Sequence, residues 1–138
     1  MERAEDDAID RGFSEFGAAF AAYLERHRSC RGVVLTDDDG FPIDYARRCA
    51  GISALDVQIL GATVERALAP LREVVRVRGL GPPTLCAVAE RGVLLTSPLA
   101  VDTTLAAIHG AGVDDGALAA LTADFEALAE RVLGLLRA

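Results

Sequence analysis

The chain has no lysine, no asparagine and no tryptophan, and all 14 of its basic residues are arginine. The lack of lysine excludes a P-loop lysine and every mechanism that uses a lysine Schiff base. Histidine and cysteine are also scarce, with two and three copies. The cysteines lack the spacing of a zinc site, and no secretory signal precedes them. We therefore expect thiols in a reduced, cytoplasmic setting.

Positive charge is in the minority, because 21 acidic residues give the 138-residue chain a net charge of −7. A nucleic-acid binder is not expected, since such proteins carry a basic patch. Hydrophobic residues make up 51% of the chain, but no run reaches the roughly 18 apolar residues of a membrane span. The length fits one domain, and the apolar excess must be buried in its core or against a partner. Self-association is the simplest expectation.

Residues 1–12 (MERAEDDAIDRG) are acidic and poor in bulky apolar side chains. They are predicted to be a mobile tail ahead of a single domain at residues 13–138. The alternative is a recognition peptide that folds on a partner. Residues 13–28 have the period of an amphipathic helix whose aromatic face we expect in the core. That face consists of Phe13, Phe16, Phe20, Leu24 and His27.

A β-hairpin is predicted next, with strands at residues 33–35 and 41–46 around the turn at residues 37–40. Three successive aspartates in this turn suggest a metal site, but neighbouring residues of a tight turn point in different directions. We expect a solvated hairpin tip and no metal. The arginine pair that follows, Arg47 and Arg48, is either solvated or docks on an acidic partner.

Residues 53–79 form the longest predicted helix, and both of its ends are marked. Ser53 occupies the N-cap position and Gly79 the C′ position. Pro70 interrupts the pattern, so the helix either kinks there or ends near residue 69 and is followed by a short strand. The apolar side chains at helical spacing, predicted to face a sheet, are Leu55, Ile59, Val64, Leu68, Leu71 and Val75.

Three strand-like segments follow the loop at residues 79–83, and they cover residues 85–89, 93–96 and 103–108. They are apolar on both faces, which suits a sheet covered by helices. A final helix ends near residue 136, and its nearly heptad stripe either docks on the sheet or pairs with another chain. The predicted order is therefore α-β-β-α-β-β-β-α, an α/β (α+β) domain.

Catalytic constellations are hard to find in this sequence. A Cys86–His109 pair could be drawn across neighbouring strands, but nothing marks the orienting group and oxyanion site that nucleophilic catalysis needs. The sequence also has no glycine-rich phosphate loop after a strand and no Gly-x-Ser-x-Gly elbow. We therefore expect a binding or scaffolding domain that is not an enzyme and uses no cofactor.

Two stretches give this order of elements a family resemblance. Residues 33–43 (VVLTDDDGFPI) resemble the first hairpin of Roadblock/LC7 domains, in which an Asp-rich turn leads into Gly-Leu/Phe-Pro. Residues 80–81 and 87–99 (AVAERGVLLTSPL) are similar to the family's second half, a Gly-rich break and a strand hairpin that ends near Pro-Leu. The likeness spans about residues 13–136, and its ordered set of features, rather than any one motif, identifies the family.

The resemblance implies a profilin-like, five-stranded antiparallel sheet with the long helix on one face and the terminal helices on the other. It also implies dimers that join the strand after the long helix across two chains and pack the two long helices together. Glycine is unfavourable in a helix interior by about 1 kcal/mol, so we expect a second helix to approach closely at Gly61. Gly61→Leu should then give a monomer. The predicted dimer and partner surface, whose polar helix residues should face away from the sheet, comprises Gln58, Gly61, Thr63, Glu65, Arg66, Arg72, Leu85 and Ala87.

Bacterial MglB-like members of this family regulate small Ras-like GTPases. The resemblance therefore implies a non-catalytic dimeric regulator or adaptor of such a GTPase, with a GTPase-activating role. Arg47, Arg48 and Arg72 are then the candidate GTPase contacts or arginine fingers. One alternative is a structural scaffold subunit of a signalling or motility complex that leaves nucleotide turnover unchanged, and another is a small-molecule sensor.

Overall fold

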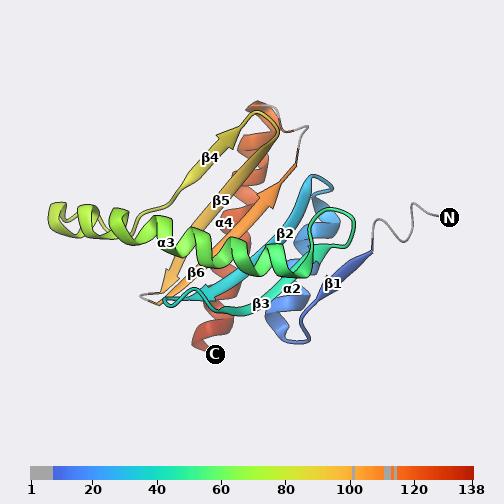
Figure 1. The fold of residues 1–138 in the computed structure, drawn as a ribbon, viewed down its shortest axis with the longest axis horizontal. Coiled ribbons are helices and arrows are strands. Elements are labelled where there is room, and N and C mark those ends of the chain that lie inside the picture. Colours follow the sequence, from blue (N-terminus) through green and yellow to red (C-terminus); the bar gives the residue numbers. More distant parts are fainter. Residues whose placement is uncertain (1–7, 101, 111–112, 114) are drawn as a thin grey trace.

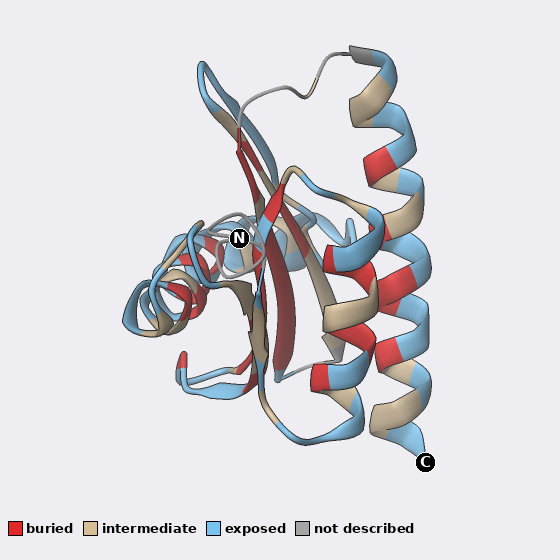
Figure 2. Cartoon of the chain, turned by 90° about the vertical axis from the view of Figure 1, so that its right-hand side faces the viewer, coloured by how far each residue is buried: buried red, intermediate tan, exposed pale blue. Residues whose placement is uncertain are grey.

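The structure, a computed structural model, describes residues 8–100, 102–110, 113 and 115–138. Within these residues, six strands form one antiparallel sheet in the order β1-β3-β2-β6-β5-β4 (Figure 1). Helix α3 covers one face of the sheet, and α2 and α4 cover the other (Figure 2). In chain order the elements are β1 (Ile9–Arg11), α2 (Glu15–Arg26), β2 (Cys30–Asp37), β3 (Pro42–Arg48), α3 (Ala54–Arg78), β4 (Cys86–Ala89), β5 (Gly92–Ala100), β6 (Thr103–His109) and α4 (Asp115–Arg137).

The predicted layers and element order are confirmed, with a correction at the N-terminus. We expected five strands and a mobile tail through residue 12, but Ile9–Arg11 form β1, a sixth strand that pairs with β3. The register places Asp10 opposite Arg47. So short an edge strand is made by pairing rather than by a hydrophobic period, which is why the sequence pattern missed it. Residues 1–7 of the predicted tail lie outside the described residues.

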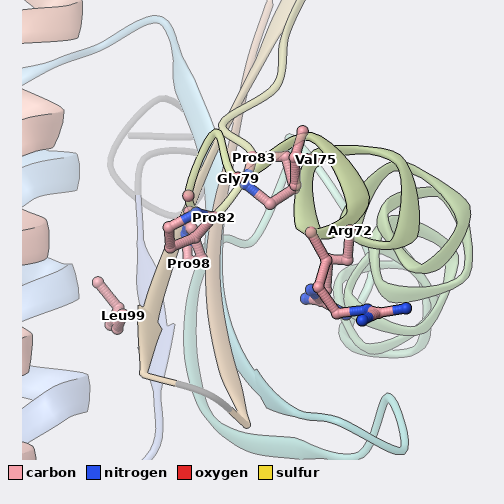
Figure 3. A pocket seen from close by; sticks show the side chains of 9 residues that line it. Arg72, Val75, Gly79, Pro82, Pro83, Pro98 and Leu99 are labelled. Atoms are coloured by element: carbon pink, nitrogen blue, oxygen red, sulfur yellow. The ribbon is translucent and has the colours of Figure 1, made fainter.

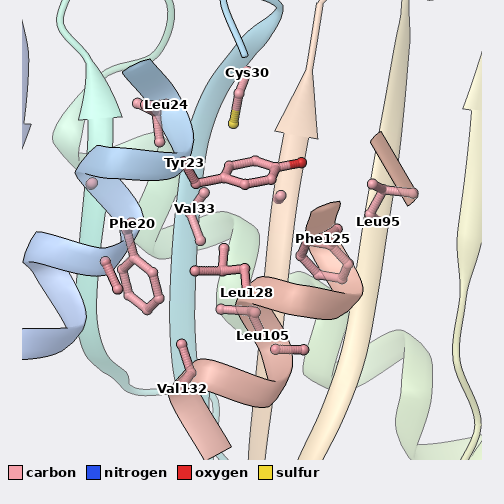
Figure 4. Close-up of a cluster of buried hydrophobic side chains, with 14 of the residues drawn as sticks. Phe20, Tyr23, Leu24, Cys30, Val33, Leu95, Leu105, Phe125, Leu128 and Val132 are labelled. Atoms are coloured by element: carbon pink, nitrogen blue, oxygen red, sulfur yellow. The ribbon is translucent and has the colours of Figure 1, made fainter. Parts of the chain in front are cut away.

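The apolar core has two parts, one on each face of the sheet. The larger part lies between the sheet and helices α2 and α4, where Phe20 and Tyr23 of α2 join Phe125 and Leu128 of α4 (Figure 4). Burying such a side chain contributes roughly 1.5–3 kcal/mol, so this layer supplies most of the hydrophobic stabilisation. The smaller part lies beneath α3 and consists of Val34, Val57, Val64, Leu68 and Ala106.

Helix α2 begins two residues later than predicted, because two side chains cap it at Ser14. The Ser14 hydroxyl accepts the N–H of Gly17 at 3.4 Å, and the buried carboxylate of Asp44 on β3 accepts the same N–H at 3.1 Å. Phe13 precedes this cap and is fully exposed, so its predicted place in the core is wrong. Phe20, on the same predicted face, is completely buried.

Helix α3 continues through Pro70, so the alternative of a helix end near residue 69 is wrong. Both predicted caps are confirmed: Ser53 Oγ accepts the N–H of Asp56 at 3.0 Å, and Gly79 adopts the left-handed conformation with φ of +67°. At 25 residues α3 is the longest helix of the described chain. Neither it nor another helix in the described ranges is long and apolar enough to cross a membrane.

The apolar face predicted for α3 is only half correct. Val64 and Leu68 are buried against the sheet, but Leu55, Ile59 and Leu71 are between 41% and 66% exposed. Helix α3 therefore carries two apolar stripes, one on the sheet and one in solvent. The sequence pattern merged them into a single face.

The turn at residues 37–40 is stabilised by its own first carboxylate. Asp37 Oδ1 accepts the N–H groups of Asp39 at 3.0 Å and of Phe41 at 2.9 Å. Gly40, with φ of +83°, lies against Ala62 of α3, so the tip of the hairpin also supports the long helix. The Asp37 side chain therefore stabilises the turn itself, and the ligand oxygens of Asp37, Asp38 and Asp39 lie within 4.8 Å of one another.

Candidate interaction surface on α3 and β4

The C-terminal half of α3 extends beyond the β4 edge of the sheet (Figure 1). Its outward side carries Leu71, Val74 and Val77, and Leu80 follows just after the helix. These four side chains are between 41% and 73% exposed. Exposed apolar side chains gathered in one place indicate an interaction site, because water contact with a contiguous apolar patch is unfavourable.

Strand β4 follows this part of α3 in the chain, after the loop at residues 79–83, and offers a second kind of contact. Leu85 faces β5, because its carbonyl accepts the N–H of Thr96 at 3.0 Å. Alternate residues of a strand turn their backbone groups to opposite sides, so Cys86 and Val88 direct theirs away from β5. All four residues of β4 are exposed, and within the described chain β4 ends the sheet. We call β4 together with Leu71, Val74, Val77 and Leu80 the α3–β4 surface.

Gly61 lies on the opposite side of α3 from this surface, against the sheet. A Cβ atom at Gly61 would lie 2.2 Å from Cγ2 of Thr36 and 3.4 Å from Cγ2 of Val34, both on β2. The prediction that Gly61 meets a second helix is therefore wrong, because the close approach is to the chain's own strand. Gly61→Leu would push α3 off the sheet and would not be a selective test of dimerisation.

Glu65 also faces the sheet, where it forms a buried network with Arg72 and Thr104. Both terminal guanidinium nitrogens of Arg72, Nη1 and Nη2, donate to the Glu65 carboxylate, and Nη2 also donates to Thr104 Oγ1 at 2.9 Å. The Thr104 hydroxyl in turn donates to Glu65 Oε2 at 3.1 Å. Hydrogen bonding to Glu65 raises the pKa of Arg72. The predicted outward orientation of Glu65 is wrong, and the network instead fixes α3 over β6.

Of the other residues predicted for the interface, some are exposed and some are half-buried. Thr63 and Arg66 are exposed on α3, and Ala87 is exposed on β4 within the α3–β4 surface. Gln58 is half-buried, and Leu85 is half-buried against the smaller core. The stretch Val74–Leu80, which the sequence analysis did not place in the interface, carries three of the exposed apolar side chains of the α3–β4 surface, Val74, Val77 and Leu80. Its signal was the alternation of valine and arginine beyond Pro70.

Arg47 and Arg48, the other candidate GTPase contacts, have their guanidinium groups engaged inside the domain. Arg47 donates from Nε to Asp10 at 3.0 Å and from Nη1 to the carbonyl of Ile52 at 2.9 Å. Arg48 donates to the carbonyls of Leu24 at 2.6 Å and Cys30 at 3.2 Å. The pair therefore ties β3 to its neighbours rather than presenting two solvated cations.

A groove of about 550 Å³ opens where the end of α3 meets the following loop and β5 (Figure 3). Its walls are mostly apolar, and Arg72 and Arg76 contribute the charged groups. The glycine- and proline-rich loop at residues 79–83 was the sequence signal for this feature. The remaining lining residues are Val75, Gly79, Gly81, Pro82, Pro83, Pro98 and Leu99.

His109 is buried on the opposite face of the sheet and is held by hydrogen bonds on both ring nitrogens. Nε2 lies 2.9 Å from the hydroxyl of Tyr23, and Nδ1 lies 2.9 Å from the hydroxyl of Ser29. Burial, together with the nearby charge of His27, lowers the pKa of His109 to about 4. Cys86 lies on β4 with β5 between it and β6, so the two do not form a Cys–His pair.

Comparisons with known proteins agree with this geometry. No protein-family model matches the sequence, and no match was found among curated proteins. Among solved structures, a Roadblock/LC7 domain from Streptomyces avermitilis is 18% identical with a TM-score of 0.72, over 88% of this chain and 97% of that chain. Myxococcus xanthus MglB is 13% identical with a TM-score of 0.75, over 91% of this chain and 97% of that chain.

A further solved structure, described as MglB with a tetrameric arrangement, is 14% identical with a TM-score of 0.70. The match covers 86% of this chain and 85% of that MglB chain. At these identities the likeness establishes the fold. The chain therefore has the Roadblock/LC7 fold, as the resemblance of its hairpins implied, with β1 as an additional strand.

Proposed function

We propose that this chain, built on the Roadblock/LC7 fold, is a non-catalytic regulator or adaptor that forms a homodimer and binds a small Ras-like GTPase. The observation that carries the proposal is the α3–β4 surface. It combines an open strand edge with exposed apolar side chains on a helix that extends beyond the sheet, and both are features that another chain commonly covers.

The uncovered part of the sheet beside α3 supports a second copy as that cover. Next to the β4–β5 hairpin, a groove of about 290 Å³ has Ala87, Ala89, Leu94 and Ile108 in its lining, together with the charged residues Arg31 and Arg91. A two-fold axis at β4 would continue the sheet across both chains and lay the extending half of each α3 over this groove of the other chain. One rotation would thus cover the edge, the helix and the groove together.

The GTPase part of the proposal rests on the likeness to MglB and on the hairpin resemblance. Because Arg47, Arg48 and Arg72 are engaged inside the domain, we propose that the chain acts on the switch loops of the GTPase rather than by inserting an arginine finger. Two paired α3 helices offer a broad platform for such loops. A scaffold that binds the GTPase without changing its turnover is the alternative.

The experiment is GTP hydrolysis by a small Ras-like GTPase of the same cell, measured with and without this chain. We expect wild type to accelerate hydrolysis and Val77→Glu, which places a charge on the α3–β4 surface, to lose the effect. Phe13→Glu is the control, since Phe13 is also exposed (102%, against 67% for Val77) but precedes α2 and lies outside the α3–β4 surface. Binding without acceleration would favour the scaffold, and absence of binding would contradict the proposal.

A further inference from the structure

The sheet has two edges, and they differ in this chain. One edge is β4, whose outer side is open in the described structure. The other edge would be β3, but β1 covers it with only three residues, Ile9–Arg11. Strand β1 is the one strand that the predicted five-stranded sheet does not contain.

The backbone of β3 shows what β1 covers. Cys49 N–H donates to the carbonyl of Ala8 at 2.8 Å, and Gly12 N–H donates to the carbonyl of Tyr45 at 3.0 Å. Arg47 lies midway between these two contacts, opposite Asp10. In an antiparallel pair, every second residue directs its backbone N–H and C=O groups toward the partner strand. On β3 these residues are Tyr45, Arg47 and Cys49, whose backbone groups face β1. Without β1 they would form an open edge like that of β4.

Side chains hold β1 in place more firmly than three residues of pairing would. The Asp10 carboxylate accepts from Nε of Arg47 at 3.0 Å and from the hydroxyl of Tyr45 at 3.1 Å. Ile9 packs against the larger core. Gly12 then passes so close to Asp44 that a Cβ would lie 1.6 Å from its Oδ1, which positions the strand just ahead of the α2 cap.

We propose that β1 is an edge cap that confines association between copies of this chain to β4. The inference rests on the proposed function, because it takes β4 as the edge at which two copies pair. Strand β1 then ends the sheet itself, but its three residues offer another chain only a very short outer side, which is one way in which natural proteins blunt a sheet edge. A chain with one long open edge forms a closed pair, whereas a chain with two long open edges adds copies at both ends and grows without limit. The occupant of an uncovered β3 edge would therefore be a strand of another copy.

The test uses the full chain with Asp10→Pro, which removes both the carboxylate and the backbone N–H that faces β3. Arg11→Pro is the matched control, because Arg11 is exposed and its N–H points away from β3. In sedimentation velocity over a range of concentrations, we expect Asp10→Pro to form species at least about twofold heavier than wild type. Arg11→Pro should sediment like wild type.

Two further variants separate the possible failures. Val88→Pro removes an outward N–H on β4, so Asp10→Pro/Val88→Pro has one open edge and should stop at a dimer. Asp10→Arg keeps the backbone N–H, repels Arg47 and should give a smaller increase in mass even if Asp10→Pro folds poorly. The edge cap is overturned if Asp10→Pro and Asp10→Arg, folded by circular dichroism, both sediment like wild type. A monomeric wild type would contradict only the proposed dimer, and association of Asp10→Pro alone would still support the cap.

Discussion

Replacing Gly61 by alanine is expected to lower the free energy of unfolding by about 2 kcal/mol, although alanine is the better helix former. Helix propensity alone favours alanine by about 1 kcal/mol. The new Cβ, however, would lie 2.2 Å from Cγ2 of Thr36, well inside van der Waals contact. Overpacking of this kind typically destabilises by about 1–3 kcal/mol, and the buried strand and helix leave little room for relief. Chemical denaturation at a fixed protein concentration measures the change.

Removing the methyl group that the new Cβ meets should restore part of the lost stability. Thr36→Ser removes the Cγ2 methyl, after which the nearest heavy atom to the new Cβ is Cγ2 of Val34 at 3.4 Å. The double variant Gly61→Ala/Thr36→Ser should therefore be more stable than the sum of the two single changes predicts, which a double-mutant cycle detects. An increase in stability for Gly61→Ala alone would mean that α3 does not pack this closely on β2.

Lowering the pH from 6.5 to 4 is expected to destabilise the fold by about 3 kcal/mol through His109. Burial first, and the charge of His27 second, lower the pKa of His109 from 6.5 to about 4. In this window the unfolded chain binds a proton that the folded chain does not, so stability falls as the pH falls. The difference between a pKa of 6.5 in the unfolded chain and of about 4 in the fold corresponds to about 3 kcal/mol.

The measurement is the free energy of unfolding at several pH values for wild type and His109→Gln. Glutamine cannot take up the proton, so the variant should be less stable near neutral pH but should lose less stability between pH 6.5 and 4. His27→Gln tests the smaller cause, because without the charge of His27 only burial would lower the pKa of His109. The two ring centroids lie 6.4 Å apart. An equal slope in His109→Gln and wild type would show that His109 is not kept neutral by the fold.

The ends of α3 and the first hairpin could be predicted from sequence because their signals are local. Ser53, Gly79 and Asp37 act on backbone groups within a few residues. The rotation of α3 about its axis could not be predicted, because both of its faces carry apolar residues. Its buried face also contains Gly61 and Glu65, residue types that usually indicate a break or a solvent-exposed position.

The sequence predicted that α3 and β4 carry the interaction surface, but it assigned several individual side chains to the wrong environment. Glu65 looks solvated in the sequence, because its partners Arg72 and Thr104 are seven and 39 residues away. Arg47 likewise looks solvated until β1 brings Asp10 beside it. Pairing between distant residues decides both cases, and a single sequence does not show it.

The central claim is that two copies of this chain associate through the α3–β4 surface, and sedimentation equilibrium tests it most directly. We expect wild type and Phe13→Glu to be dimers at micromolar concentration. Val77→Glu should weaken the dimer by about 3 kcal/mol, more than about 100-fold in Kd, because it buries an uncompensated charge. A wild-type monomer throughout this range, or a Val77→Glu chain that dimerises as tightly as wild type, would contradict the account.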